Sequence, residues 1–277
     1  MVQDPERYAS ADMVPHAVKG ELDTLVEGGV IPVASPKAFP VVEIFGPTIQ
    51  GEGAVVGTVS HFVRFGGCSY RCIWCDSMHA VDPQQIKENA RKLTSRQIMD
   101  ELLQLTVGVP MIRPYWVTLS GGDPCMWQLS DLVIQLQHKG YKVAVETQGA
   151  LWRDWLREVD LVTLSPKPPS SGMDGKLNPL LLNRIIMGAR KVVLKIVIFT
   201  EGDLTWAREI HKNFPEVQMY LSAGTTPAHG ESQHQIVFGI LNNLQKLVDW
   251  VKADPYMYDC IVLPQVHALL WGHMKGV

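Results

Sequence analysis

Three cysteines lie close together at a spacing suited to metal binding. Cys68, Cys72 and Cys75 form a Cys-x₃-Cys-x₂-Cys run. Cysteine thiolates hold iron–sulfur clusters, and a ferredoxin-type cluster normally takes four of them. Three thiolates from one loop would leave one iron of a [4Fe–4S] cluster open to the amino and carboxylate groups of S-adenosylmethionine (SAM). The run therefore predicts a cluster that cleaves SAM on reduction and yields a 5′-deoxyadenosyl radical.

Zinc is the main alternative for these cysteines. His79 follows Cys75 by four positions, so a Cys₃His site is conceivable. Structural zinc sites more often pair two short knuckles that are distant in sequence, whereas this is one tight run. A third reading is structural thiols without any metal. Cys125 and Cys260 are distant from the run, and we interpret both as ordinary buried cysteines.

Polar residues follow several of the predicted strands downstream. Ser120-Gly-Gly122, Glu146-Thr147-Gln148 and Ser165-Pro166-Lys167 each lie at or just after a strand end. Adjacent glycines let a backbone approach a ligand closely, and a strand-end acid or amide can hold ribose hydroxyls. Each segment alone is also a common turn or polar strand end. Lys195 lies between Leu194 and Ile196, so it would point into a barrel, where a buried amine needs a partner.

A second group of polar residues precedes the cysteines. The segment from Gln50 to Gly53 contains a glutamine, a glutamate and two glycines. Glutamate offers acceptors to an N–H/NH₂ edge, and glutamine offers both a donor and an acceptor. This segment therefore suggests a pocket for a polar heterocycle, although a plain glycine-rich turn is equally compatible with it. Arg64, on the first predicted strand, could bind a carboxylate through two nitrogens.

Alternating strands and helices must position these side chains. We predict four helices. The first begins at Thr94 with a capping box to Gln97, and the second runs from about Leu129 to Gly140. The third starts behind Asp203, and the fourth covers Ile240–Val251. The predicted strands are Val59–Phe65, Trp116–Leu119, Tyr141–Thr147, Asp160–Leu164, Val192–Phe199, Gln218–Leu221 and Asp259–Leu263.

This alternation predicts an α/β fold with a mainly parallel sheet. About six units are too few for a closed eight-fold barrel, so we expect a partial (β/α)₆ barrel with its site at the carboxyl ends of the strands. An open doubly wound sheet is the alternative. We expect residues 1–38 to form an N-terminal extension, and residues 39–277 to form one core domain.

Composition excludes several classes of protein. With 277 residues, 46% of them hydrophobic, the chain can bury a sizeable core. The net charge of −3 gives no basic excess for nucleic acid. The sequence contains neither a long apolar run for a membrane span nor the features of a secretory signal. Five cysteines are too few for a disulfide scaffold and favour a reducing, cytoplasmic location.

Several segments together resemble the 7-carboxy-7-deazaguanine synthase family, a radical SAM family of queuosine biosynthesis. The resemblance runs from about residue 40 to the C-terminus and does not cover the extension. The cysteine run is typical of the whole superfamily, whereas the loops at 50–53 and 165–169 are more specific. The matching segments are residues 44–53, 68–77, 120–122, 146–149, 165–169 and the closing Leu-Pro-Gln-x-His at 263–267.

The resemblance implies a reaction. The substrate would be 6-carboxy-5,6,7,8-tetrahydropterin. Hydrogen abstraction from C6 would start a ring contraction that releases ammonia and forms 7-carboxy-7-deazaguanine. SAM would be regenerated and so act as a cofactor. Mg²⁺ would lie beside the substrate carboxylate, with the Ser77 hydroxyl as its protein ligand. Such an enzyme would be a carbon–nitrogen lyase. The resemblance also implies a homodimer and an external electron donor such as flavodoxin.

The resemblance also assigns roles to residues of this chain. The cluster ligands would be Cys68, Cys72 and Cys75. SAM would be held by Trp74, Cys75, Asp76, Gly122, Glu146, Thr147, Gln148, Ser165, Pro166 and Lys167. The pterin would be held by Ile49, Gln50, Gly51, Glu52, Arg64, Ser120 and His267.

Two positions depart from the family pattern. Ser77 stands where threonine is common, which keeps the hydroxyl but loses the methyl that restricts χ1. Asp123 stands where glutamate is common in radical SAM enzymes, and its shorter arm puts a direct contact with SAM in doubt. The alternative function is another radical SAM enzyme, such as a glycyl-radical activase, which acts on a protein and needs no pterin pocket.

Overall fold

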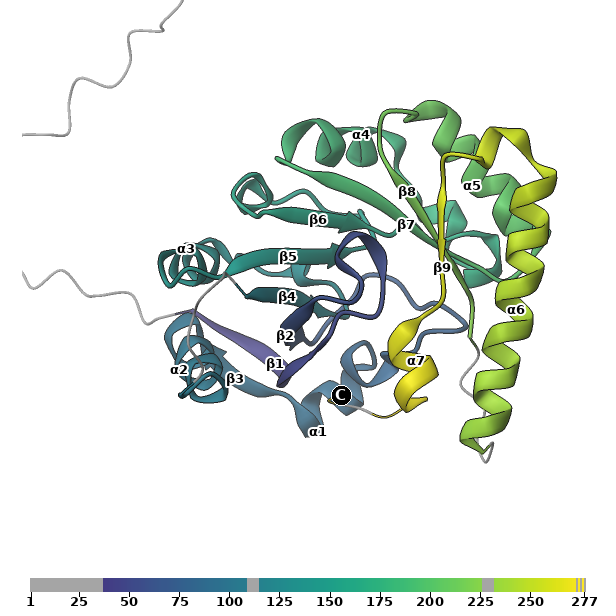
Figure 1. The fold of residues 1–277 in the computed structure, drawn as a ribbon. Coiled ribbons are helices and arrows are strands. Elements are labelled where there is room, and N and C mark those ends of the chain that lie inside the picture. The colour runs from purple at the N-terminus through teal and green to yellow at the C-terminus, as the bar shows by residue number, and fades with distance from the viewer. Residues whose placement is uncertain (1–36, 109–114, 226–231, 273, 275, 277) are drawn as a thin grey trace, which may run out of the picture. The chain divides into compact units, whose positions relative to one another are not determined.

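The computed structural model describes residues 37–108, 115–225, 232–272, 274 and 276. Within this part of the chain, nine strands form one curved sheet in the order β3-β1-β2-β4-β5-β6-β7-β8-β9 (Figure 1). The strands from β2 to β9, except β3, run parallel: β2 (Val59–Phe65), β4 (Trp116–Gly121), β5 (Lys142–Thr147), β6 (Leu161–Leu164), β7 (Val192–Ile198), β8 (Met219–Ala223) and β9 (Ile261–Leu263). Each matches a predicted strand to within two residues, so the predicted α/β fold with a mainly parallel sheet is confirmed.

Helices cover the outer face of this sheet (Figure 1). These helices are α2 (Ser95–Leu105), α3 (Ser130–His138), α4 (Pro179–Gly188), α5 (Glu201–Asn213) and α6 (Gln233–Ala253). Two shorter helices do not belong to this layer: α1 (Pro83–Asn89) contacts β1, and α7 (Val266–Trp271) contacts α6. The apolar side chains of α2 to α6 and those of the strands form one large core. Burial of these side chains supplies the main stabilisation of the fold. None of the described helices is long and apolar enough to cross a membrane.

Side-chain caps fix where the helices begin. Thr94 and Gln97 form the predicted capping box of α2. The prediction that α5 starts behind Asp203 is wrong, because Thr200 is its N-cap and Asp203 closes a capping box on it. The long helix α6 begins seven residues before Ile240, since Ser232 and Gln235 form a further box there. Gly140 follows α3 with a φ of 84°, as a glycine after a helix end does.

Two strands were not predicted. β1 (Ala38–Ile49) pairs antiparallel with β2 on one side and with β3 (Arg91–Thr94) on the other. Gly46 and Pro47 lie inside β1, and such a pair normally indicates a loop. β2 pairs with β1 on both sides of these two residues, at Phe45 and at Thr48, and so keeps the segment extended across a register shift. Apart from its last two residues, the predicted extension 1–38 lies outside the described residues.

The inner face of the sheet carries two layers of side chains, because alternate residues of each strand point inward. The lower layer is apolar: Ala144, Leu161 and Val193 pack against Ala54 and Val55. The last two belong to the 3₁₀ turn Gly53–Val55, which follows β1 and lies against β7. The next inward residues along the strands are polar. The loop after β1 therefore closes the floor of a polar cavity at the carboxyl ends of the strands.

Candidate active site

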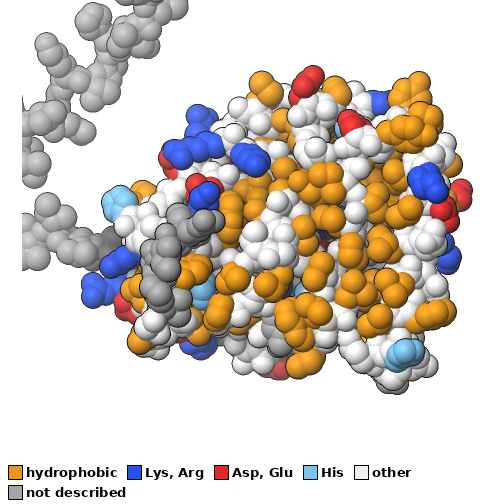
Figure 2. All heavy atoms as spheres, viewed as in Figure 1, with side chains coloured by type: hydrophobic (Ala, Val, Ile, Leu, Met, Phe, Trp, Pro, Cys, Tyr) orange, Lys and Arg blue, Asp and Glu red, His pale blue; other side chains and the backbone are white. Residues whose placement is uncertain are grey.

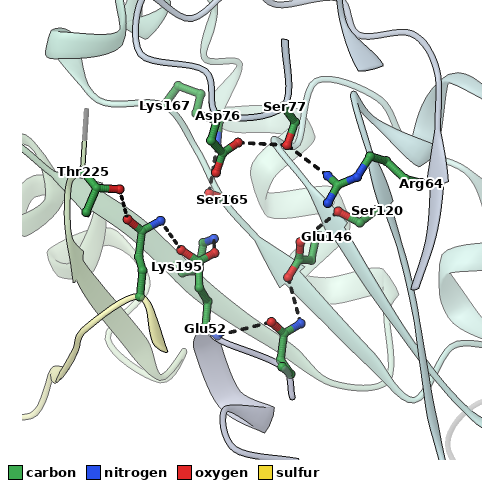
Figure 3. A network of polar contacts seen from close by, with 12 residues as sticks. Glu52, Arg64, Asp76, Ser77, Ser120, Glu146, Ser165, Lys167, Lys195 and Thr225 are labelled. Atoms are coloured by element: carbon green, nitrogen blue, oxygen red, sulfur yellow. Dashed lines mark hydrogen bonds and ion pairs between the residues drawn. The ribbon is translucent and has the colours of Figure 1, made fainter. Parts of the chain in front are cut away.

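One cavity collects the residues singled out in the sequence. Its lining includes the cysteine loop, the strand ends of β4, β5 and β7, and the segments at 49–52 and 265–267. Every predicted site residue lines it except Pro166, which is buried beside Ser165 and Lys167 without reaching the cavity. Figure 3 shows the polar side chains that converge on it from different strands and loops.

The cysteine loop is fixed to its neighbours through its backbone. The Gly67 amide donates to the Ala80 carbonyl at 2.8 Å, and the Ile73 amide donates to the Ser171 carbonyl at 3.1 Å. Cys72 is buried, Cys68 and Cys75 are half-buried, and all three are free thiols. The loop thus presents three thiols to one cavity without a disulfide between them.

The spacing of the thiols does not suit a single zinc ion. Ligands of one tetrahedral zinc lie about 2.3 Å from it, so they are within about 4 Å of one another. Among the described residues, three side chains of His, Cys, Asp or Glu bring their ligand atoms within 4.8 Å of one another at His211, Asp259 and Cys260, and the three loop cysteines do not. His79 instead faces Glu43, with 3.4 Å between its Nε2 and the carboxylate. The separated thiols fit a cluster, whose irons lie at different corners.

Burial controls the protonation of the three thiols. It raises the pKa of Cys68 and of Cys72, and it raises the pKa of Cys75 to about 11 with a further contribution from the nearby Asp76 carboxylate. The Lys167 ammonium acts in the opposite direction on all three. Since only thiolates bind iron, cluster binding must release protons here, and Lys167 favours that release.

The wall beside the cysteines is aromatic and basic. The Trp74 indole donates to the Ser170 hydroxyl at 3.1 Å and lies 5.0 Å from the Phe199 ring. Lys167 stands over the Trp74 ring at 5.9 Å and donates to the Ser165 hydroxyl at 3.0 Å. An aromatic face next to an ammonium group can receive a heterocycle and a carboxylate, which are both parts of SAM.

The Gly121-Gly122 turn has a backbone role. A Cβ on Gly122 would lie 2.2 Å from the Gly67 carbonyl oxygen, and one on Gly121 would lie 2.1 Å from the Phe65 carbonyl oxygen. The Asp123 amide also donates to Gly67 O at 2.7 Å. The glycines therefore let β4 dock directly against the base of the cysteine loop. Asp123 is fully buried and lies outside the cavity lining.

Glu146, on β5, connects the loop after β1 to strand β4. One carboxylate oxygen accepts from the Gln50 amide at 3.1 Å, and the other accepts from the Ser120 hydroxyl at 3.0 Å. Sequence reasoning placed Glu146 with SAM, but its described partners are residues expected to hold the substrate. Gln148, two residues on, donates to Ser69 Oγ at 3.1 Å and so reaches the cysteine loop.

Arg64 connects two polar residues that line the cavity, Glu43 on β1 and Ser77 just after the cysteines. Its Nε donates to Glu43 at 3.0 Å. A terminal nitrogen donates to the Ser77 hydroxyl at 2.9 Å, as Figure 3 shows. The Ser77 hydroxyl in turn donates to the Asp76 carboxylate at 2.9 Å. The His79 ring and the Arg64 guanidinium hold the pKa of Glu43 below its usual range. Arg64 therefore grips Glu43 through one nitrogen and keeps another directed at Ser77.

Glu52, in the loop after β1, and Lys195, on β7, form a buried ion pair in the cavity wall. Lys195 Nζ binds one oxygen of the Glu52 carboxylate, and the Gln265 amide donates to the other oxygen at 2.6 Å. Burial alone would raise the pKa of Glu52, but the attraction of Lys195 outweighs it and lowers this pKa to about 2. The partner that a buried Lys195 requires is thus Glu52.

Sequence reasoning missed several lining residues. Glu43, Lys195, Gln265 and Thr225 were not placed among the site residues, although all four line the cavity. The signal for Lys195 was present, because a lysine inside an apolar strand demands a buried partner. Gln265 and Thr225 follow β9 and β8, and only the curvature of the sheet brings them near Glu52. The prediction that Cys260 is buried is wrong, since it is half-buried at the opposite end of β9.

Known proteins resemble the chain in sequence and in fold. No model of a protein family matches the chain. The 7-carboxy-7-deazaguanine synthases of Bacillus cereus and Bacillus subtilis are each 39% identical to it, over 86% and 87% of this chain and 99% of each relative. The crystal structure of QueE from Escherichia coli superposes with a TM-score of 0.60 at 19% identity, covering 83% of this chain and 95% of that one.

The sequence likeness is high enough, over enough of both chains, to show common ancestry, and the fold of the Escherichia coli protein agrees with it. The site geometry described above points the same way, with three separated thiols beside a polar cavity. The chain belongs to the 7-carboxy-7-deazaguanine synthase family.

Proposed function

We propose that the protein converts 6-carboxy-5,6,7,8-tetrahydropterin into 7-carboxy-7-deazaguanine and ammonia as a radical SAM lyase. One observation carries the proposal: a single cavity holds the cysteine loop on one side and a buried set of acceptors and donors on the other. An iron–sulfur protein without a small-molecule substrate has no need for the set of buried acceptors and donors that faces the cysteine loop. Residues 39–277 would form the catalytic domain, and residues 1–38 an extension to it.

The cysteine side fits a [4Fe–4S] cluster and SAM. Cys68, Cys72 and Cys75 would hold the cluster, which together with SAM supplies the radical that removes the hydrogen from C6. Trp74 and Lys167 would receive the adenine and the carboxylate of SAM, as their stacked arrangement allows. The other proposed SAM contacts are Asp76, Gly122, Glu146, Thr147, Gln148 and Ser165. Pro166 is left out of this set, since it does not line the cavity.

The cavity wall that faces the cysteine loop fits a pterin with a carboxylate. Arg64 would bind the substrate carboxylate, since it lines the cavity and is a cation. Gln50, Glu52 and Ser120 would bind the polar edge of the ring, supported by Ile49, Gly51 and His267. Because the ring would be held at both ends, its C6–H would be directed at one point, which is catalysis by positioning. Buried walls would keep water away from the radical.

Mg²⁺ is proposed beside Ser77. The Ser77 hydroxyl and the adjacent Asp76 carboxylate are oxygen donors of the kind that this ion prefers. The Arg64 guanidinium, 2.9 Å from the same hydroxyl, opposes a second cation there. The ion would therefore need the substrate carboxylate, which could neutralise Arg64 and complete the ligand set with water.

A homodimer and an external electron donor such as flavodoxin are further parts of the proposal. Figure 2 shows hydrophobic side chains spread over the face to which α6 and α7 contribute. Phe238 and Leu241 of α6 and Leu270 of α7 are among the exposed ones. Exposed apolar area of this kind favours association. Sedimentation of the purified protein tests the dimer, and reduction by flavodoxin in place of dithionite tests the donor.

The test of the function is an anaerobic turnover assay. Protein with its cluster reconstituted is incubated with carboxytetrahydropterin, SAM and dithionite, with and without Mg²⁺. The expected result is 7-carboxy-7-deazaguanine and ammonia, with SAM recovered. An intact cluster that cleaves SAM but leaves the pterin unchanged would contradict the proposal and favour an enzyme of the glycyl-radical activase type.

A further inference from the structure

Lys195 lies in the middle of β7 and points to the inside of the sheet. It is 8% exposed, and its ammonium group binds the Glu52 carboxylate. We propose that Lys195 is a positioning residue, which keeps Glu52 ionised and oriented so that Glu52 binds the N–H/NH₂ edge of the pterin. The inference rests on the proposed function and adds how the substrate edge is selected.

Two side chains hold the carboxylate of Glu52, and a third contact fixes its backbone. Lys195 binds one oxygen, and Gln265 donates to the other at 2.6 Å. The Thr225 hydroxyl donates to the Gln265 side-chain oxygen at 2.6 Å, which fixes the amide with its NH₂ group toward Glu52. The Glu52 backbone amide donates to Gln50 at 3.2 Å. Figure 3 shows this chain of contacts running from Thr225 to Glu52.

The fixed carboxylate keeps acceptor capacity for a ligand. Its two oxygens offer about four acceptor positions, of which Lys195 and Gln265 use two. The remaining two, on a group that lines the cavity, match a pair of adjacent N–H donors. A 2-amino-4-oxo pyrimidine ring presents such a pair at N3 and the 2-amino group. A 2,4-dioxo ring lacks the amino group and would leave one acceptor unpaired.

The lysine is needed because the carboxylate is buried. Burial disfavours its charge, and the Lys195 ammonium offsets this. The other charged or titratable groups near the pair are His267, which acts on Glu52, and Glu146 and Asp76, which act on Lys195. Neither acid can replace Lys195 as a cation. Without Lys195, Glu52 would take up a proton as the pH falls and would lose an acceptor.

The test compares steady-state kinetics of reconstituted wild type, Lys195→Met, Lys195→Arg and Lys195→Met/Glu52→Gln between about pH 6 and pH 9. In Lys195→Met we expect the KM for the pterin to rise at least about tenfold at neutral pH. It should fall again as the pH rises, with a smaller change in kcat. Lys195→Arg should restore most of the affinity. The double variant should keep a high KM at every pH, because it lacks the titrating carboxylate.

Matched variants separate positioning from folding. Lys191→Met replaces an exposed lysine just before the same strand and should leave the KM unchanged. If Lys195→Met does not fold, Lys195→Gln removes the charge while keeping a donor, and the same pH-dependent KM is expected. The inference is overturned if Lys195→Met, or Lys195→Gln in its place, keeps the KM of the wild type and shows no new pH dependence. It is also overturned if the pH dependence of the KM persists in the double variant Lys195→Met/Glu52→Gln. Wild type that makes no product overturns the proposed function instead.

Discussion

The Arg64 guanidinium donates a hydrogen bond of 2.9 Å to the Ser77 hydroxyl, which is the hydroxyl proposed to bind Mg²⁺. A cation and this guanidinium cannot share the hydroxyl without a negative group between them. The substrate carboxylate is the group that the reaction provides. Under the proposed function, this contact would couple Mg²⁺ binding to substrate binding.

Mg²⁺ binding should depend on the substrate and on the Ser77 hydroxyl. We expect Ser77→Ala to raise the Mg²⁺ concentration for half-maximal activity by about ten- to a hundred-fold, the range for disturbed metal sites. Ser77→Thr keeps the hydroxyl and restricts χ1, so its Mg²⁺ requirement should be equal or lower. Product formation against Mg²⁺ concentration measures both. An unchanged requirement in Ser77→Ala would place the metal elsewhere.

Loss of one loop cysteine should abolish the cluster. Cys72→Ala should lack the brown chromophore after anaerobic reconstitution, because two thiolates would remain for the cluster. Cys260→Ala, half-buried and far from the cavity, is the control and should keep iron, sulfide and colour. Metal analysis checks the result. One zinc and no iron in the wild-type protein would restore the zinc hypothesis.

Gly122→Ala should destabilise the base of the cysteine loop. The new Cβ would lie 2.2 Å from the Gly67 carbonyl oxygen, so one backbone segment must shift. We expect a loss of more than about 2 kcal/mol in the free energy of unfolding and a lower cluster content. Gly175→Ala is the matched control, since a Cβ there has no atom within 4 Å. Denaturant unfolding with iron analysis measures both, and equal behaviour of the two variants would contradict the docking role.

Asp123 should make stability dependent on pH. Burial raises its pKa from the ordinary 3.8 to about 6, so the folded chain binds this proton more tightly than the unfolded chain. Its contribution is fully present below about pH 4 and is lost as the pH rises through 6. Asp123→Asn keeps an oxygen for the Cys125 amide, which now donates to Asp123 at 3.0 Å.

Relative to wild type, Asp123→Asn should therefore gain stability between pH 4 and pH 8, by up to about 3 kcal/mol for a shift of this size. Urea unfolding of the cluster-free protein at both pH values gives the difference. A variant whose stability runs parallel to the wild type across this range would show that Asp123 does not carry the proton.

The sequence by itself determined the parallel strands, the cluster loop and the family. Those features are local: β-branched runs bounded by turns predict strands, and three cysteines within eight residues share one loop in any fold. The capping box at Thr94 is equally local and was predicted with its partner. The antiparallel strand β1 was not predicted, because Gly46 and Pro47 are held extended by the pairing of their neighbours Phe45 and Thr48 with β2.

Only the tertiary structure decided how the polar side chains pair. Glu52 and Lys195 are 143 positions apart, and Gln50 and Glu146 are 96 apart. No local pattern connects such residues. They meet because the sheet curves and the loop after β1 enters its inner face, where a buried charge must find an opposite charge. The physical need for a partner could be predicted from the sequence, whereas the identity of that partner depends on the closure of the fold.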